Sequence, residues 1–77
     1  MAQVIFQYFK KEIDSDKILV RINPTSMEGL ELLVSSTGEV AQQMRQFDEY
    51  IYEDLTFDEF EKSSPIEFNL YLAAIKS

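Results

Sequence analysis

The side chains best able to do chemistry lie together in one segment of the chain, residues 48–61. This segment contains seven carboxylates and no basic residue, and four aromatic side chains are interleaved with them. The carboxylates are Asp48, Glu49, Glu53, Asp54, Asp58, Glu59 and Glu61. Carboxylates can act as general acids or bases, hold hard metal ions, or attract a basic partner. The remainder of the chain is electrically neutral, so the net charge of −7 belongs to this segment.

The residue types that are missing exclude most catalytic centres. The sequence has no histidine and no cysteine, which removes the commonest general base, thiolate nucleophiles, disulfides and zinc sites built on these ligands. Gly29 and Gly38 are too far apart for a phosphate-binding loop or a dinucleotide fingerprint. A carboxylate pair such as Glu53 and Asp58 would need a cleft and a raised pKa to transfer protons. We therefore expect no catalytic residue, no cofactor and no enzymatic activity.

One sequence pattern suggests a metal site but fails in detail. Asp14-Ser15-Asp16 matches the start of a calcium-binding loop. Leu19 stands where that loop needs glycine, and Thr25 stands where it needs glutamate. We therefore expect no metal site, and interpret these residues as a turn whose Asp side chains bond to local backbone.

Binding of a protein partner is the function that the segment favours. Its carboxylates would attract a basic partner, and one or two aromatic side chains would supply buried anchors. Tyr50 and Tyr52 are the best exposed candidates, because Ile51 and Leu55 define the inward helix face and both tyrosines lie off it. The predicted binding residues are Tyr50, Tyr52, Glu53, Asp54, Asp58, Glu59 and Glu61.

Two other interpretations of the segment stay open. The acid pairs at 48–49, 53–54 and 58–59 repeat every five residues, which spreads charge around a helix. Such a solvated face that binds nothing is the commoner meaning of a charge cluster. The carboxylates could also imitate the phosphates of a nucleic acid on a basic protein. Direct nucleic-acid binding is not expected, since only seven basic residues are scattered through the chain.

Length and composition indicate one folded domain over residues 1–77. A chain with 45% hydrophobic and 13% aromatic residues is apolar enough to fold, and its length is too short for two domains. The N-terminal residues lack the basic start of a signal peptide, and no apolar run approaches the roughly 20 residues of a membrane span. We therefore expect a cytoplasmic location and no membrane association.

Alternating apolar residues predict an antiparallel sheet in the first 47 residues. Strands are expected over 4–9, 18–22 and 30–34, with turns at 14–16 and 23–26. Residues 35–39 predict a hairpin connection, with Gly38 supplying a positive φ. Residues 40–47 suit either a returning strand or a long helix, and we favour the strand because 30–34 needs a paired neighbour.

Capping patterns predict the first helix after the sheet. Asp48 can cap a short helix whose inner face carries Ile51 and Leu55, with Phe47 just before it. Thr56 and Glu59 form a capping-box pattern, which indicates that the first helix stops here and a short turn restarts at Phe57.

A clearer start signal precedes the last segment of the chain. Ser64 is placed to cap a helix, Pro65 fits its first position, and Glu67 is placed to reach back to the cap. Residues 66–75 also alternate as a strand would, but the capping residues and the alanine pair favour a helix.

The predicted fold is therefore α+β. It is a small single domain in which an antiparallel sheet of three or four strands is packed on one face by two or three short C-terminal helices. If residues 3–10 form an edge strand, pairing across a two-fold axis would cover its apolar side chains. A structural subunit assembled through such a homodimer is the alternative function, and a carboxylate- and metal-dependent enzyme is the third.

Overall fold

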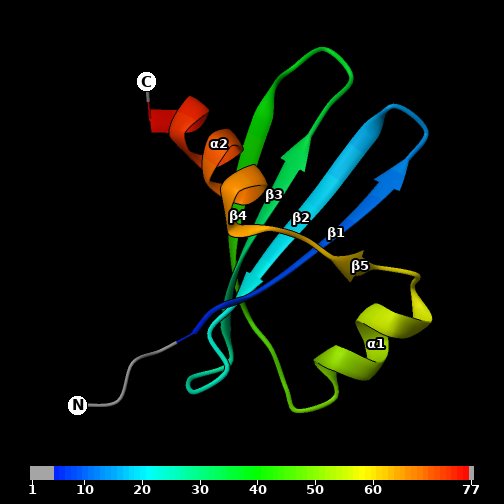
Figure 1. Ribbon diagram of the computed structural model, residues 1–77, viewed down its shortest axis with the longest axis vertical. Coiled ribbons are helices and arrows are strands. Elements are labelled where there is room, and N and C mark those ends of the chain that lie inside the picture. The colour runs from blue at the N-terminus through cyan, green and yellow to red at the C-terminus, as the bar shows by residue number, and fades with distance from the viewer. Residues whose placement is uncertain (1–4, 77) are drawn as a thin grey trace.

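The computed structural model describes residues 5–76, which form one antiparallel sheet with a helix on each face (Figure 1). In chain order the elements are β1 (Gln7–Ile13), β2 (Asp16–Ile22), β3 (Glu28–Val34), β4 (Val40–Gln46), α1 (Ile51–Phe57), β5 (Glu61–Lys62) and α2 (Pro65–Lys76). Within these residues the sheet has five strands in the order β4-β3-β2-β1-β5. The α+β class is confirmed, with five strands where three or four were predicted.

Strand β2 is buried on both of its faces. Leu19 points to the face covered by α2, where it joins a cluster with Leu32 and Phe68. Val20 and Ile22 point to the opposite face, which α1 covers. We call these the α2 face and the α1 face. The prediction that helices cover one face only is wrong, because β2 carries apolar side chains on both sides and each side needs cover.

The predictions for the middle of the sheet are confirmed. β2 and β3 contain the predicted strands, and Leu30, Leu32 and Val34 are all buried as expected. Gly38 has a φ of 90° in the turn that joins β3 to β4. Residues 40–46 are the favoured returning strand rather than a helix, because they pair with β3 along their whole length.

The first strand lies later in the chain than predicted. It was expected over 4–9 and is observed over Gln7–Ile13, while residues 1–4 lie outside the described part of the chain. The strand continues through two lysines because C-terminal side chains contact both of them. Lys10 forms an ion pair with Glu67, and Lys11 lies over the ring of Phe60.

The position of β1 in the sheet also differs from the expectation. β1 lies between β2 and the short strand β5, so it is not the edge strand that the homodimer alternative would require. β5 pairs with β1 through Glu61 and Lys62. Two residues give no alternation to detect, and this strand was not predicted.

Helix α1 continues through Thr56 to Phe57, where the sequence predicted a stop and a restart. Its inner face carries Ile51 and Leu55 as predicted. Asp48 does not cap it directly, since its Oδ1 accepts a hydrogen bond from the Tyr50 N–H in the turn before the helix (2.9 Å). The Thr56 hydroxyl donates to the Tyr52 carbonyl within the helix (3.0 Å). Thr56 is therefore a helical residue here, and the predicted restart after it is wrong.

Helix α2 starts where the capping residues predict. The Ser64 Oγ accepts a hydrogen bond from the Glu67 N–H (3.2 Å), and Pro65 is the first helical residue. Phe68 is fully buried, and Leu72 and Ile75 pack on the same cluster from later turns. The Glu67 side chain does not follow the prediction, because it is directed to lysines of the sheet instead of back to the cap.

A buried glycine fixes the path of the chain from β4 into α1. Gly29 lies on β3, and the ring of Phe47 occupies the space that a Cβ atom at this position would need. Phe47 in turn packs with the cluster under α1. An alanine at position 29 would therefore push the aromatic ring out of its place.

We predict that Gly29→Ala lowers the free energy of unfolding by about 1–3 kcal/mol, since overpacking has this cost. Urea denaturation of Gly29→Ala, Phe47→Ala and the double variant would measure the interaction free energy between positions 29 and 47. The double variant should be more stable than the sum of the single losses implies, because removing the ring makes room for the methyl group. Gly38→Ala is the control: nothing lies near its Cβ position, so its effect should add to that of Phe47→Ala. Additivity for both glycines would contradict the prediction.

Candidate functional site

Residues 48–61, which we call the acidic-aromatic segment, contain helix α1 and the turns on either side of it. Leu55 is buried against Val20 and Ile22, and Ile51 is half-buried beside it. An isolated helix of this length is only marginally stable in water, so these apolar contacts hold α1 on the sheet. The sides of α1 that do not touch the sheet carry the charged residues.

All seven carboxylates of the segment are exposed. The described side chains form three ion pairs, which use Lys10, Lys17 and Arg45 with Glu67 and Glu31. Among these described pairs, none involves a carboxylate of residues 48–61. The negative charge of the segment therefore faces solvent without a basic neighbour bound to it.

The two tyrosines proposed from the sequence have different environments. Tyr50 is 57% exposed, as expected. Tyr52 is half-buried, and its ring packs against Phe9 of β1 with 6.0 Å between centroids. Tyr52 therefore belongs partly to the core under α1, and only Tyr50 is a freely exposed tyrosine of the predicted pair.

Phe57 is the aromatic residue that sequence reasoning did not select. Its side chain is 88% exposed, more than any other large apolar side chain described. Together with Tyr52, Glu53 and Thr56 it lines a shallow, open depression at the end of α1. The exposure of Phe57 could have been predicted from its spacing, because a residue two positions after the buried Leu55 points to the opposite side of a helix.

The carboxylates of the segment are spread rather than gathered. Their five-residue repeat distributes them around α1 and the turn that follows it. Among residues 5–76, no three Asp or Glu side chains come close enough together to hold a metal ion. The arrangement produces a broad negative field with exposed aromatic side chains inside it.

An apolar hollow lies elsewhere on the protein, at the hairpin end of the sheet. Its volume is about 400 Å³, and Ile13, Ile18, Leu33 and Ala41 supply much of its lining. Only Asp16, Lys17 and Glu39 bring charge to it. Ile13, Leu33 and Ala41 are exposed to solvent at this end of the sheet, and Ile18 is half-buried.

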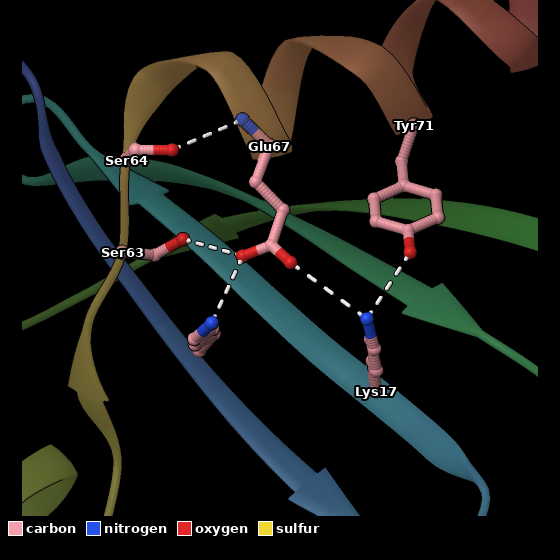
Figure 2. Close-up of polar contacts among 6 residues, drawn as sticks. Lys17, Ser63, Ser64, Glu67 and Tyr71 are labelled. Carbon is pink, nitrogen blue, oxygen red and sulfur yellow. Dashed lines mark hydrogen bonds and ion pairs between the residues drawn. The ribbon is translucent and has the colours of Figure 1, made fainter.

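A second polar cluster ties α2 to the sheet, and Figure 2 shows how its side chains converge on Glu67. The Glu67 carboxylate accepts a hydrogen bond from the Ser63 hydroxyl (3.0 Å). It pairs with Lys10 at 3.3 Å and with Lys17 at 3.7 Å. The Lys17 ammonium also donates to the Tyr71 hydroxyl (3.3 Å). β1, β2 and α2 are thus connected through one carboxylate.

The protonation of this cluster follows from its contacts. The hydrogen bond with Tyr71, reinforced by the nearby Glu67 and Glu12 charges, raises the pKa of Lys17 above its ordinary value although partial burial opposes this. Burial is the largest single influence on Glu67 and raises its pKa, but the Ser63 and Lys10 hydrogen bonds and the lysine charges together lower it. Both groups are therefore fully charged at neutral pH, and the cluster acts as a structural tie.

We predict that Glu67→Gln destabilises the protein by about 1 kcal/mol near neutral pH, since hydrogen bonds to a half-exposed charged group contribute about this much. Because the folded-state pKa of Glu67 is lowered, its contribution is present above the ordinary value of 4.5 and is lost as pH falls through the folded pKa. Urea denaturation at about pH 7 and about pH 3 should show the difference from wild type vanish in acid. Glu39→Gln, an exposed acid outside the cluster, should match wild type at both pH values. A Glu67→Gln difference that persists in acid would contradict the charge-based tie.

No helix within residues 5–76 is long and apolar enough to cross a membrane. No protein-family model matches the chain, and comparisons with curated proteins and with solved structures find no match either. The function must therefore be inferred from the arrangement of its own residues.

Proposed function

We propose that the chain is a small, non-enzymatic module that binds a basic protein partner through the acidic-aromatic segment, residues 48–61. The observation that carries the proposal is the exposure of Phe57, 88%, within a group of carboxylates that have no basic neighbour among the described ion pairs. An aromatic anchor inside a charged rim is the usual composition of a protein interface.

The exposed phenylalanine supplies a driving force for association. Burying a phenylalanine side chain contributes about 1.5–3 kcal/mol relative to leaving it in water. In the monomer Phe57 gains almost none of this free energy because its side chain stays in water, whereas Leu55, two positions earlier, is buried on the sheet. Tyr50 adds a second exposed ring with a hydroxyl that can form hydrogen bonds.

The carboxylates determine which partners approach this aromatic side chain. A cluster of like charges attracts an oppositely charged surface and speeds its association, and the effect weakens with salt. Every carboxylate of the segment is exposed, so the field acts through solvent on an approaching partner. A basic protein surface with an apolar pocket fits this combination.

The state of the remaining polar groups supports a binding role over a catalytic one. Among the described side chains, Lys17 and Glu67 have perturbed pKa values, and both are shifted away from neutrality. A general acid or base works best with a pKa near the working pH. Both groups instead hold α2 in place, which leaves the acidic-aromatic segment as the surface with unused interactions.

We predict that a partner captured from a lysate of the organism that encodes the protein is lost when four acids of the segment are neutralised. The variant carries Asp54→Asn, Asp58→Asn, Glu59→Gln and Glu61→Gln. Capture by wild type should be strong at low salt and weaker at moderate salt, because salt screens the attraction. Affinity capture on immobilised protein followed by mass spectrometry is the measurement.

The matched control neutralises four exposed acids elsewhere, through Glu12→Gln, Asp14→Asn, Glu28→Gln and Glu39→Gln. Both variants change the net charge equally, so only the position of the charge differs. Retention of the partner by the control and loss by the first variant would assign the binding to residues 48–61. Equal capture by both variants, or no capture by wild type at any salt concentration, would overturn the proposal.

A second prediction concerns the aromatic anchor. Phe57→Ala should weaken binding of the captured partner about 10-fold or more, since central interface aromatics commonly contribute this much. Leu70→Ala is the control, because Leu70 is 67% exposed on α2 and lies outside the segment. Isothermal titration calorimetry would give both dissociation constants, and thermal unfolding should be nearly unchanged in both variants. Equal affinities would show that Phe57 is no anchor.

A further inference from the structure

The sheet has one long open edge, formed by β4. Within residues 5–76, its seven residues, Val40–Gln46, pair with β3 on one side only. Ala41 to Gln46 are all exposed, and the strand contains no proline, no lysine and no acid. Its one charged residue, Arg45, is directed to Glu31 within the same sheet (3.9 Å). Proteins normally protect such an edge with charges, proline or a short strand.

The opposite edge of the sheet is protected in just this way. β5 contains only two residues, Glu61 and Lys62, and both are charged. Beyond it, the free part of β1 includes Lys11 and Glu12. A strand of another chain could therefore extend the sheet at β4, whereas β5 offers it only two residues for backbone pairing.

The hydrogen-bond register shows which backbone groups of β4 are available. The Ser35 N–H donates to the Glu39 carbonyl (2.9 Å), and the Phe47 N–H donates to the Met27 carbonyl (2.9 Å). In an antiparallel pair every second residue uses its backbone groups toward a given neighbour. By this alternation the odd-numbered residues of β4 bond to β3, and its even-numbered residues direct their N–H and C=O groups outward. These are Val40, Gln42, Met44 and Gln46.

We propose that two copies of this chain pair through β4, antiparallel across a two-fold axis at Gln43, to form one continuous sheet. This register places Gln42 opposite the partner's Met44 and Val40 opposite the partner's Gln46. All of the outward-facing residues then pair with the outward-facing residues of the second copy. A two-fold axis uses the same edge on both copies, so the assembly closes as a dimer.

The distribution of charge favours a second copy as the occupant. The chain has a net charge of −7, which would ordinarily oppose self-association. The acids from Glu53 to Glu61 lie with α1 and β5 toward the far side of the sheet from β4, whereas Asp48 and Glu49 directly follow the end of β4 (Figure 1). Four strand spacings separate β5 from β4, about 19 Å, which exceeds the screening length of about 8 Å at physiological salt. Within Val40–Gln46 this register places Arg45 opposite the partner's Ala41, so no like charges face each other along the paired strands.

An apolar side chain also gains cover in the dimer. Met44 is 67% exposed and lies on the α2 face, because it is paired with Leu30. Helix α2 extends across this face toward β4, where Val40 packs against the same cluster as Leu72 and Ile75 (Figure 1). In this register the partner's Met44 lies beside Gln42. Gln42 is close to Val40, the end of β4 that α2 covers. Pairing thus shields an apolar side chain that the monomer leaves in water.

A charge exchange on the edge tests both the dimer and its register. Sedimentation equilibrium of wild type, up to about 0.5 mM, should show twice the 9.0 kDa chain mass. Gln42→Lys with Met44→Lys places lysines directly opposite each other twice, so the dimer should dissociate at least 10-fold more readily. Gln42→Lys with Met44→Glu places opposite charges in the same positions and should preserve the dimer. Both pairs of changes affect exposed side chains, so the monomer should fold unchanged.

Hydrogen exchange gives a second measurement that needs no variant. The amides of Gln42 and Met44 should become protected as wild-type concentration rises, while those of Ala41 and Gln43 should be protected at every concentration. The variant with four neutralised acids in residues 48–61 should stay dimeric, which separates this proposal from the proposed partner binding. A 9.0 kDa mass at all concentrations, or equal dissociation of the lysine–lysine and lysine–glutamate variants, would overturn the proposal. Capture of a different chain on β4 with a monomeric wild type would also overturn it.

Discussion

The burial of β2 on both faces is the constraint on which the rest of the structure depends. Leu19 and Ile22 are both 0% exposed, yet they point to opposite sides of the sheet. One helix cannot cover both, so the C-terminal third of the chain divides its apolar residues between α1 and α2. The chain must then pass around the sheet between these helices. β5 lies on this passage, where it pairs with the outer side of β1 (Figure 1).

The same division produces two kinds of carboxylate. Glu67 lies where α2 approaches the sheet, and lysines of β1 and β2 neutralise it. The acids around α1 take part in none of the described ion pairs, because that helix contacts the sheet through Ile51, Tyr52 and Leu55, which carry no charge. A short helix attached by a narrow apolar side exposes most of its surface, including Phe57. The exposed carboxylates and the exposed aromatic side chain therefore lie on the same part of the surface.

Features with a local signal could be predicted from the sequence. The alternation in 18–22 and 30–34, the turn at Gly38 and the start of α2 at Ser64 each depend on residues a few positions apart. β5 and the continuation of β1 through its lysines could not be predicted, because both depend on contacts between opposite ends of the chain. The placement of Tyr52 failed for a related reason. Its position on the helix indicated solvent, but Phe9 of β1 lies close enough to pack against it.

The order of the strands has a consequence for how the molecule forms. β1 to β4 are each joined to the next by a tight connection, so these pairs close short loops and should assemble early. β5 and α2 must return across nearly the whole chain to reach β1, which carries the larger loop-closure cost. Until they dock, the four-stranded meander exposes Leu19 and Leu32 as well as its open edge. The segment that reaches the sheet last, β5 and α2, is thus the one that ends the aggregation-prone stage of folding.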